Sequence, residues 1–107
     1  MTYYNMTATV MVDVREYLSD EDRREGIFGY RNVDNHIECF NSDFDAQITF
    51  YTVDDTEWYG VFDVNVTIEY VGDDITFEEW KSYEYEFLSY LGENWRDVEF
   101  SMSEDEE

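Results

Sequence analysis

The sequence is poor in basic residues and in the residues that hold metals or cross-link a chain. Its 107 residues include five arginines, one lysine, one histidine, one cysteine and no proline. A single cysteine excludes an intramolecular disulfide, which fits a reducing compartment such as the cytoplasm. His36 and Cys39 supply only two of the four ligands of a tetrahedral zinc site. We expect a strand here, on which residues three apart point to opposite faces, so His36 and Cys39 should not form a nucleophilic pair either. Cys39 is expected to be a small buried residue.

Long apolar segments are also missing. No stretch approaches the 18 or so consecutive apolar residues of a membrane-spanning helix. Residues 1–4 lack the basic residues of a signal peptide. An acidic surface is repelled by anionic membranes and by nucleic acid. We therefore expect a cytoplasmic protein, with basic partners, that contacts neither a membrane nor nucleic acid directly.

The sequence contains none of the common catalytic or cofactor-binding motifs. It has no Gly-x-Ser-x-Gly, no phosphate-binding loop and no dinucleotide fingerprint. Asn41, Asp43 and Asp45 begin like a calcium loop, but Ala46 and Thr52 replace the turn glycine and the bidentate glutamate. Among so many acids, carboxylate pairs at glycosidase spacing arise by chance and carry no signal. We expect no enzyme, no metal ion and no cofactor.

Acidic and aromatic residues dominate what is present. There are 28 Asp and Glu against six Lys and Arg, a net charge of −22, and 20% of the residues are aromatic. Disordered acidic chains lack aromatic residues, so this composition indicates a compact core inside an acidic shell. Scaling for this length predicts a radius of gyration of about 13 Å and a diameter of roughly 35 Å. That length of duplex DNA carries on the order of 20 phosphate charges, which is close to the net charge of the protein.

Hydrophobic periodicity predicts an α+β fold: a mostly antiparallel sheet of four to six strands, with one long helix packed on one face. The long helix should span about 76–91, where Thr76 and Glu79 form a capping box and Gly92 is the C-terminal cap. A short helix near 19–25 begins at Ser19. We expect residues 1–102 to form one acidic domain and 103–107 a disordered acidic tail. The expected strands cover residues 7–14, 27–31, 36–40, 46–53, 62–70 and 98–102.

Most of the large aromatic residues should be buried. The expected core set is Phe28, Phe50, Trp58, Phe62, Trp80, Phe87 and Trp95. Four tyrosines are candidates for exposure, where they would stack on arginines of a partner or lie flat over the edge of the domain itself. They are Tyr3, Tyr4, Tyr59 and Tyr85.

Three functions fit an acidic shell. The first is a DNA mimic, whose carboxylates take the place of phosphates in a basic groove. The second is halophilic adaptation, in which surface acid keeps a protein soluble in molar salt, although the many large aromatics and only two alanines argue against it. The third is an acidic solubilising or histone-chaperone-like module, but such proteins concentrate their acid in long tails.

In composition, in size and in the acidic ending at 103–107, the chain resembles the small acidic DNA-mimic proteins of bacteriophages and mobile elements. These include anti-restriction proteins, anti-CRISPR proteins and inhibitors of uracil-DNA glycosylase. The resemblance implies a bacterial target that binds DNA: a restriction–modification enzyme, a CRISPR effector, or a repair or nucleoid protein. A second copy of the chain is a further candidate partner, since a homodimer would extend the charged track.

The carboxylates expected to bind the partner fall into three groups. If the strands share one orientation, the strand carboxylates lie together on the sheet face that the long helix leaves open. They are Asp13, Asp63, Glu69, Asp97 and Glu99. The loop acids are Asp54, Asp55, Glu57, Asp73 and Asp74, and the helix acids are Glu78, Glu79 and Glu86.

Overall fold

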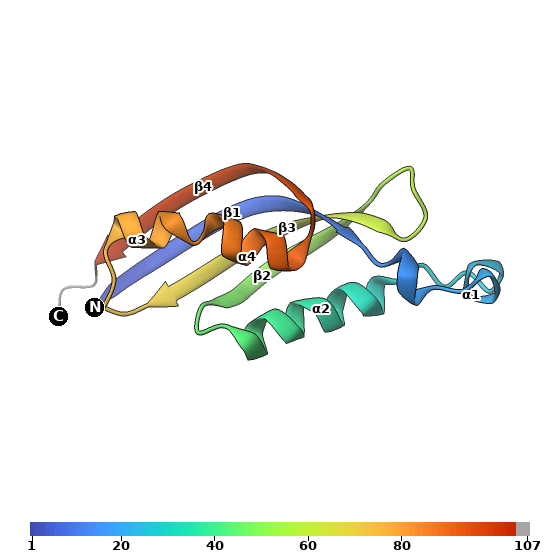
Figure 1. Cartoon of the computed structure of the whole chain (residues 1–107), viewed down its shortest axis with the longest axis horizontal. Helices are drawn as coiled ribbons and strands as arrows, with labels where there is room; N and C mark the ends of the chain where they lie inside the picture. Colours follow the sequence, from blue (N-terminus) through green and yellow to red (C-terminus); the bar gives the residue numbers. More distant parts are fainter. Residues whose placement is uncertain (105–107) are drawn as a thin grey trace.

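The computed structural model describes residues 1–104 as an α+β fold built on a four-stranded antiparallel sheet (Figure 1). Its strands are β1 (Thr2–Asp13), β2 (Gln47–Asp55), β3 (Val61–Val71) and β4 (Asn94–Glu104). Its helices are α1 (Asp20–Arg24), α2 (Tyr30–Asp43), α3 (Phe77–Ser82) and α4 (Glu84–Leu91), with a 3-10 turn, η1 (Arg15–Tyr17), after β1. The α+β class, the antiparallel sheet and the short helix capped by Ser19 are confirmed.

The strands lie in the order β2-β3-β1-β4, and each neighbouring pair is antiparallel. β1 and β2 are therefore parallel to each other, with β3 inserted between them. When α3 and α4 are counted together and η1 and α1 are left aside, the element order is β-α-β-β-α-β. This is the ferredoxin-like, or split βαβ, arrangement.

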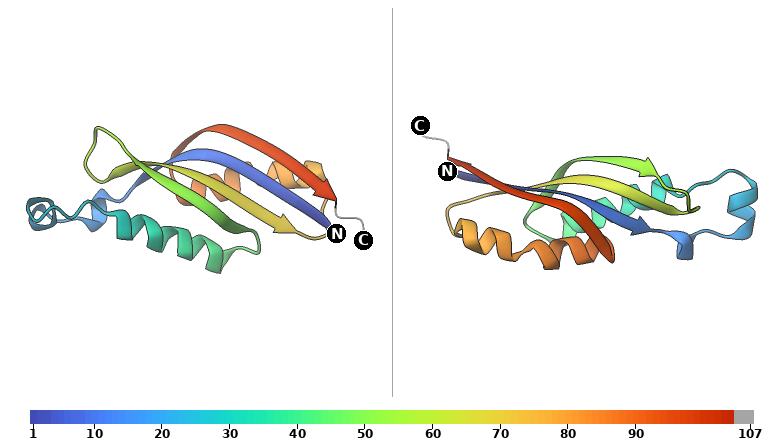
Figure 2. Two further views of the ribbon diagram at one scale, coloured as in Figure 1. Left: turned by 180° about the vertical axis from the view of Figure 1, so that it is seen from behind. Right: turned by 90° about the horizontal axis from the view of Figure 1, so that it is seen from above.

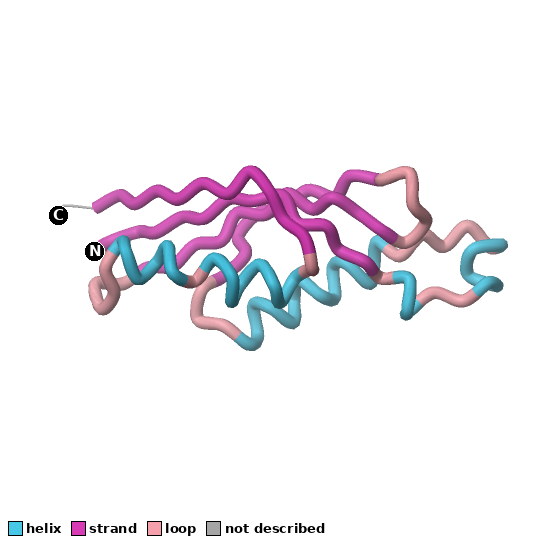
Figure 3. The backbone as a smooth tube through the Cα atoms, turned by 45° about the horizontal axis from the view of Figure 1, so that its top comes forward, coloured by secondary structure: helices cyan, strands magenta, loops and turns pink. Residues whose placement is uncertain are grey.

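The helices α2, α3 and α4 all lie on one side of the sheet (Figures 2 and 3). Alternate residues of the two central strands point to this side, and Met6, Val10, Val64 and Ile68 are completely buried there. Trp80 of α3 is also completely buried, and its indole N–H donates to the Asn5 carbonyl at 3.0 Å. We call the opposite side of the sheet the outer face. The side chains that point to it include Asn5, Thr7, Thr9 and their cross-strand partners. Within residues 1–104 no helix covers it.

The strands expected at 27–31 and 36–40 are wrong, because residues 27–29 form no strand and residues 30–43 form helix α2. Val33, Ile37 and Phe40 recur at helical spacing and are buried against the sheet. His36 and Cys39 therefore sit one turn apart on a helix, and Cys39 is exposed, not buried as expected.

The single helix expected at 76–91 is also wrong. Tyr83 interrupts it with φ −81° and ψ −1°, and its N–H bonds to the Trp80 carbonyl in a tight turn that separates α3 from α4. Gly92 is extended, with φ −169° and ψ 174°, so it is not a left-handed cap. A Cβ at this position would lie 2.1 Å from the Met11 carbonyl oxygen, so the close approach to β1 explains the glycine.

A β-bulge between Ile48 and Phe50 inverts the expected facing of β2 from Phe50 onwards, whereas Ile48 points inward as expected. Phe50 therefore lies on the outer face and is 64% exposed, whereas Tyr51 turns inward. Phe28 and Trp58, also expected in the core, are 52% and 60% exposed. Of the tyrosines expected at the surface, Tyr85 is exposed and Tyr4 is buried.

The last strand is longer than the expected 98–102. β4 reaches Glu104, and Ser103 and Glu104 pair with Tyr3 and Thr2 of β1, so these two residues belong to the sheet. The rest of the expected tail, 105–107, lies outside the described residues. A second bulge opposite Thr7 and Thr9 contains Asp97, whose φ of 57° is in the left-handed region that Asp tolerates better than most residues.

The molecule is a rod of 55 × 22 × 19 Å with a radius of gyration of 15.5 Å. The expected sphere-like diameter of roughly 35 Å is therefore wrong. The long strands run along the rod, and the segment that carries η1 and α1 extends it beyond one end of the sheet (Figure 1).

Candidate interaction surface

Few of the carboxylates are paired with a cation. Within residues 1–104, ion pairs join Asp13 to Arg15 at 2.6 Å, Glu78 to Lys81 at 3.2 Å, and Arg96 to Asp63 and Asp97 at 3.2 and 3.7 Å. Apart from Asp63, whose side chain is 25% exposed, the paired side chains are 40% exposed or more, and exposed pairs contribute little to stability. Most of the negative charge therefore remains uncompensated by the protein's own cations.

Tyrosine hydroxyls take the place of cations as partners of several carboxylates. Tyr51 of β2 donates to Asp34 of α2 at 2.6 Å, and Tyr90 of α4 donates to Asp43 of α2 at 2.6 Å. Tyr70 of β3 donates to Asp74 at 2.7 Å, and Tyr30 of α2 donates to Asp55. A neutral donor fixes the orientation of a carboxylate without cancelling its charge.

These hydrogen bonds keep the phenols protonated. Hydrogen bonding to the carboxylate, with burial as the second cause, raises the pKa of Tyr51, Tyr70 and Tyr90 to about 12. The same causes raise the pKa of Tyr30. Each phenol is therefore a neutral donor throughout the physiological pH range.

Four of the five strand carboxylates expected on one face do lie on the outer face. Asp63 pairs with Met11, Glu69 with Asn5 and Glu99 with Thr7, and Asp13 shares their alternation on β1. The fifth, Asp97, lies in the bulge of β4, with its carboxylate 3.7 Å from Arg96 Nε.

The outer face is an ordered polar surface and not a continuous sheet of carboxylates. Asn65 accepts from the Thr9 hydroxyl at 2.7 Å and donates to Asp54 at 3.0 Å, which links three strands. Arg96 of β4 reaches across β1 to Asp63 of β3 at 3.2 Å. The second carboxylate oxygen of Asp63, Oδ1, is buried and has no hydrogen-bond partner within residues 1–104.

The expected loop acids lie at opposite ends of the rod (Figure 1). Asp55 and Glu57 belong to the β2–β3 end, and Asp54 faces Asp63 across the same hairpin. Asp73 and Asp74 belong to the β3–α3 loop at the other end. The Thr2 hydroxyl donates to Asp73 at 2.8 Å and lowers the pKa of that carboxyl.

The helical side of the molecule is acidic as well, so the expected residues do not form one patch. Glu78 and Glu79 lie on α3 and Glu86 on α4, away from the outer face. Further acids on this side were not among the expected partner-binding residues, because α2 was not expected. They are Asp34, Glu38 and Asp43.

Charge is therefore distributed along the whole rod. Residues 105–107 carry three of the 22 net negative charges, which leaves 19 on the rest of the chain. Spread over the 55 Å of the rod, they correspond to about one charge per 3 Å. Duplex DNA carries about one charge per 1.7 Å. The linear charge density is more than half that of the duplex.

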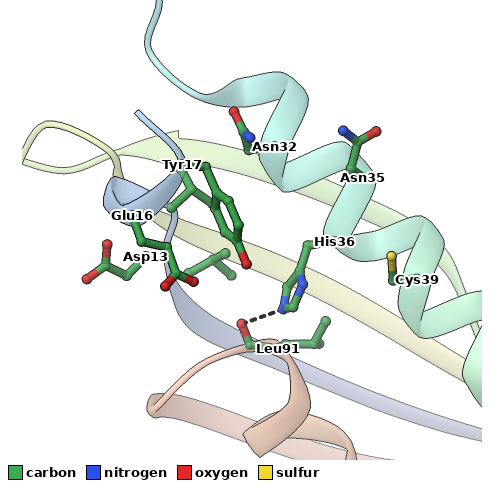
Figure 4. A pocket seen from close by; sticks show the side chains of 10 residues that line it. Asp13, Glu16, Tyr17, Asn32, Asn35, His36, Cys39 and Leu91 are labelled. Atoms are coloured by element: carbon green, nitrogen blue, oxygen red, sulfur yellow. Dashed lines mark hydrogen bonds between the residues drawn. The ribbon is translucent and has the colours of Figure 1, made fainter. Parts of the chain in front are cut away.

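A hollow of about 290 Å³ between η1, α2 and the end of α4 contains His36 and Cys39 (Figure 4). His36 Nε2 lies 3.0 Å from the Tyr90 carbonyl and 3.2 Å from the Leu91 carbonyl, so this nitrogen carries the proton and donates. No hydrogen bond joins His36 to Cys39 in the described part of the chain. His36 and Cys39 are therefore not arranged as a nucleophile and its base.

No known protein family, curated protein or solved structure matches this chain. Among the described residues, no three His, Cys, Asp or Glu side chains are grouped closely enough to hold a metal ion. In the part of the chain that the structure covers, no helix is both long and apolar enough to cross a membrane.

Proposed function

We propose that this protein is a DNA mimic that occupies the DNA-binding surface of a basic bacterial protein and excludes DNA from it. The target class is a defence enzyme, either a restriction–modification enzyme or a CRISPR effector, in the bacterial cytoplasm. A repair glycosylase or a nucleoid protein offers the same kind of basic surface and is the alternative target.

One observation carries the proposal: a 55 Å rod whose carboxylates are mostly unpaired with cations yet partly fixed in orientation by neutral tyrosines. Fixed charges bind an oppositely charged groove at a lower entropic cost than mobile ones. Asp34 and Asp43 lie on α2, on the helical side, and Asp74 lies in the β3–α3 loop, so the tyrosine hydrogen bonds fix charges beyond the outer face. These bonds also need no bound salt cation, which favours a protein that is folded at ordinary ionic strength.

We assign the contact with the target to the outer face. No helix covers this face within residues 1–104, and its carboxylates sit on strands, which hold side chains more firmly than loops do.

The test is a pull-down from bacterial lysate with the immobilised protein at about physiological ionic strength, with and without excess duplex DNA. We expect a DNA-binding protein that the duplex displaces, and whose affinity falls steeply as salt rises, because counterions are released on binding. Capture of partners that the duplex leaves in place would contradict mimicry.

Two matched triple variants then test the assigned face. Asp54→Asn, Glu69→Gln and Glu99→Gln remove three charges from exposed residues of the outer face, and Glu38→Gln, Glu78→Gln and Glu86→Gln remove three from exposed residues of the helical side. Both sets change the net charge equally. We expect the first set to weaken target binding by roughly tenfold more than the second. Equal effects would mean that the outer face is not the contact surface.

A further inference from the structure

One end of the rod exposes a cluster of large apolar side chains. The segment between α1 and α2 contributes Ile27 and Phe28, and the first residue of α2 is Tyr30. The β2–β3 loop beside it contributes Trp58, the most exposed of the three tryptophans. Clusters of this kind on a soluble protein mark places where another molecule binds.

The cluster surrounds a hollow of about 320 Å³. Its lining includes Phe28, Tyr30, Asp55, Trp58, Tyr59 and Phe62. The rings support one another: Phe28 lies 6.4 Å from Tyr30 and 6.2 Å from Tyr59, and Tyr30 lies 5.0 Å from Phe62, between ring centroids. Tyr30 and Tyr59 are also held by their hydroxyls, which donate to Asp55 and to the Ile27 carbonyl. The hollow is thus preformed.

Trp58 differs from the other two tryptophans. The Trp80 indole donates to the Asn5 carbonyl at 3.0 Å, and the Trp95 indole donates to Glu84 at 3.3 Å. The indole of Trp58 makes no hydrogen bond, ring contact or cation–π contact with any of residues 1–104. An exposed tryptophan that contributes little to its own fold is typical of an interface hot spot.

The electrostatics of the hollow select a cation. Asp55 places a carboxylate in the lining, Glu57 follows it in the same loop, and the whole chain carries −22. Aromatic faces beside a carboxylate suit arginine better than lysine. The guanidinium is planar, stacks on rings and is more weakly hydrated than an ammonium group.

The molecule already contains such a contact at this end. The Arg23 guanidinium of α1 lies 5.1 Å from the centroid of the Tyr59 ring. Arg23 thus shows that a ring of this cluster holds a guanidinium over its face, and it occupies that face of Tyr59, which leaves Trp58 as the ring without such a contact.

We propose that this hollow binds an arginine side chain of the target, which stacks on Trp58 and pairs with Asp55. The inference rests on the proposed function, because it names the group of the basic target that is recognised. The aromatic hollow would add a localised anchor to charge attraction that is otherwise spread along the rod.

The direct test uses two short peptides, one with three arginines and one with three lysines in the same glycine-containing sequence. Each is titrated against the ¹⁵N-labelled protein while the three indole N–H signals are followed. We expect the Trp58 signal to move, those of Trp80 and Trp95 to stay, and the arginine peptide to bind roughly fivefold more tightly. Equal binding of both peptides, or no movement at Trp58, would overturn the proposal.

Three variants define the site in the same titration. Trp58→Leu and Asp55→Asn should each remove the preference for arginine. Tyr85→Leu is the matched control, because Tyr85 is exposed and lies beside Glu84 and Glu86 but far along the chain from the hollow. Because Trp58→Leu removes the reporter signal, its binding is measured by calorimetry. Persistence of the arginine preference in Trp58→Leu would contradict the assignment.

The two proposals can fail separately. If a duplex-displaceable target binds Trp58→Leu as tightly as the wild type, DNA mimicry stands and the arginine anchor is wrong. If the peptide titration succeeds but no captured partner is displaced by duplex, the anchor stands and the mimicry is wrong. Sedimentation of wild type and Trp58→Leu provides a last check, because a dimer lost in the variant would mean that a second copy, and not an arginine of the target, covers the hollow.

Discussion

The Tyr90 hydroxyl on α4 donates a 2.6 Å hydrogen bond to Asp43, the last residue of α2, and so joins the two helices at the surface. Its ring packs on Phe40 and Phe44 and stacks on His36, 5.5 Å between centroids. The same residue therefore contributes to the core through its ring and fixes a surface charge through its hydroxyl. Tyr51 and Tyr70 repeat this arrangement with Asp34 and Asp74, whereas Tyr30 donates to Asp55 from an exposed ring.

Tyr90→Phe should reduce the free energy of unfolding by about 1 kcal/mol, because it removes one hydrogen bond to an exposed carboxylate and keeps the ring. Urea unfolding followed by circular dichroism measures the change. Tyr85→Phe is the control, since no hydrogen bond within residues 1–104 involves the Tyr85 hydroxyl. Equal losses in the two variants would show that the Asp43 bond contributes nothing.

The tyrosine–carboxylate pairs should also appear in an alkaline titration. Because the pKa of Tyr51, Tyr70 and Tyr90 is raised from 10.0 to about 12, the stability they provide is fully present below pH 10 and is lost as the pH rises towards 12. Asp34→Asn should lower the pKa of Tyr51 by removing the charge that opposes phenolate formation. Ultraviolet absorbance of the phenolate, compared between wild type and Asp34→Asn, measures it. An unchanged titration curve would contradict the pairing, and Asp20→Asn, which is remote from these tyrosines in sequence, is the control.

The parts of the fold that depend on local pattern could be predicted from the sequence. Strict alternation over 62–70 identified β3 within one residue at each end. Ser19 as a cap and the acids after it identified α1, and the structure adds that Ser19 and Asp22 form a capping box there. In both cases, side chains adjacent in the sequence carry the whole signal.

Other parts depend on tertiary contacts and could not be predicted in the same way. The α2 segment is rich in Asn, His, Ser and Cys, which are weak helix formers, so local propensity does not predict a helix there. The helix is stabilised instead by burial of Val33, Ile37 and Phe40 against the sheet. In β2, one additional residue at the bulge reverses the facing of Phe50, and alternation alone cannot locate a bulge.

In the candidate site, too, the features set by local pattern could be predicted and those set by tertiary contacts could not. Alternation correctly placed Asp13, Asp63, Glu69 and Glu99 on one face. Three of the four tyrosine–carboxylate bonds join residues 17 to 47 positions apart and left no trace in local spacing, whereas Tyr70 and Asp74 are four positions apart. The aromatic hollow was missed because hydrophobicity predicted burial for Phe28 and Trp58, which the loops around them do not provide.

Repulsion on the outer face should be measurable. Asp54 and Asp63 lie directly opposite each other on β2 and β3, and like charges in such pairs destabilise a sheet. Asp54→Asn should therefore raise the free energy of unfolding by about 0.5 kcal/mol, because the amide oxygen still accepts from Asn65. Urea unfolding at low salt measures it, with Glu57→Gln, in the neighbouring loop, as the control for net charge. A decrease would mean that Asp54 is stabilised by contacts that outweigh the repulsion.

Salt should stabilise the protein without being required for folding. Screening weakens repulsion among exposed charges, since the Debye length falls from about 30 Å at 0.01 M to about 10 Å at 0.1 M. We expect near-ultraviolet circular dichroism of a folded core at both concentrations, with a higher urea midpoint at the second. A chain that folds only in molar salt would instead indicate halophilic adaptation, and the case for a DNA mimic would be lost.

The two glycines Gly92 and Gly26 should respond very differently to alanine. At Gly92 the backbone is extended and suits any residue, but a Cβ would lie 2.1 Å from the Met11 carbonyl oxygen and 2.9 Å from Val10. Gly92→Ala must push α4 and β4 away from β1, and we expect it to cost about 3 kcal/mol or more, as for other overpacked sites. At Gly26 nothing lies within 4 Å, so Gly26→Ala incurs only the roughly 1 kcal/mol cost of its left-handed backbone, with φ 79°. Thermal unfolding of the two variants side by side measures the difference, and a smaller loss in Gly92→Ala than in Gly26→Ala would contradict the close contact between Gly92 and β1.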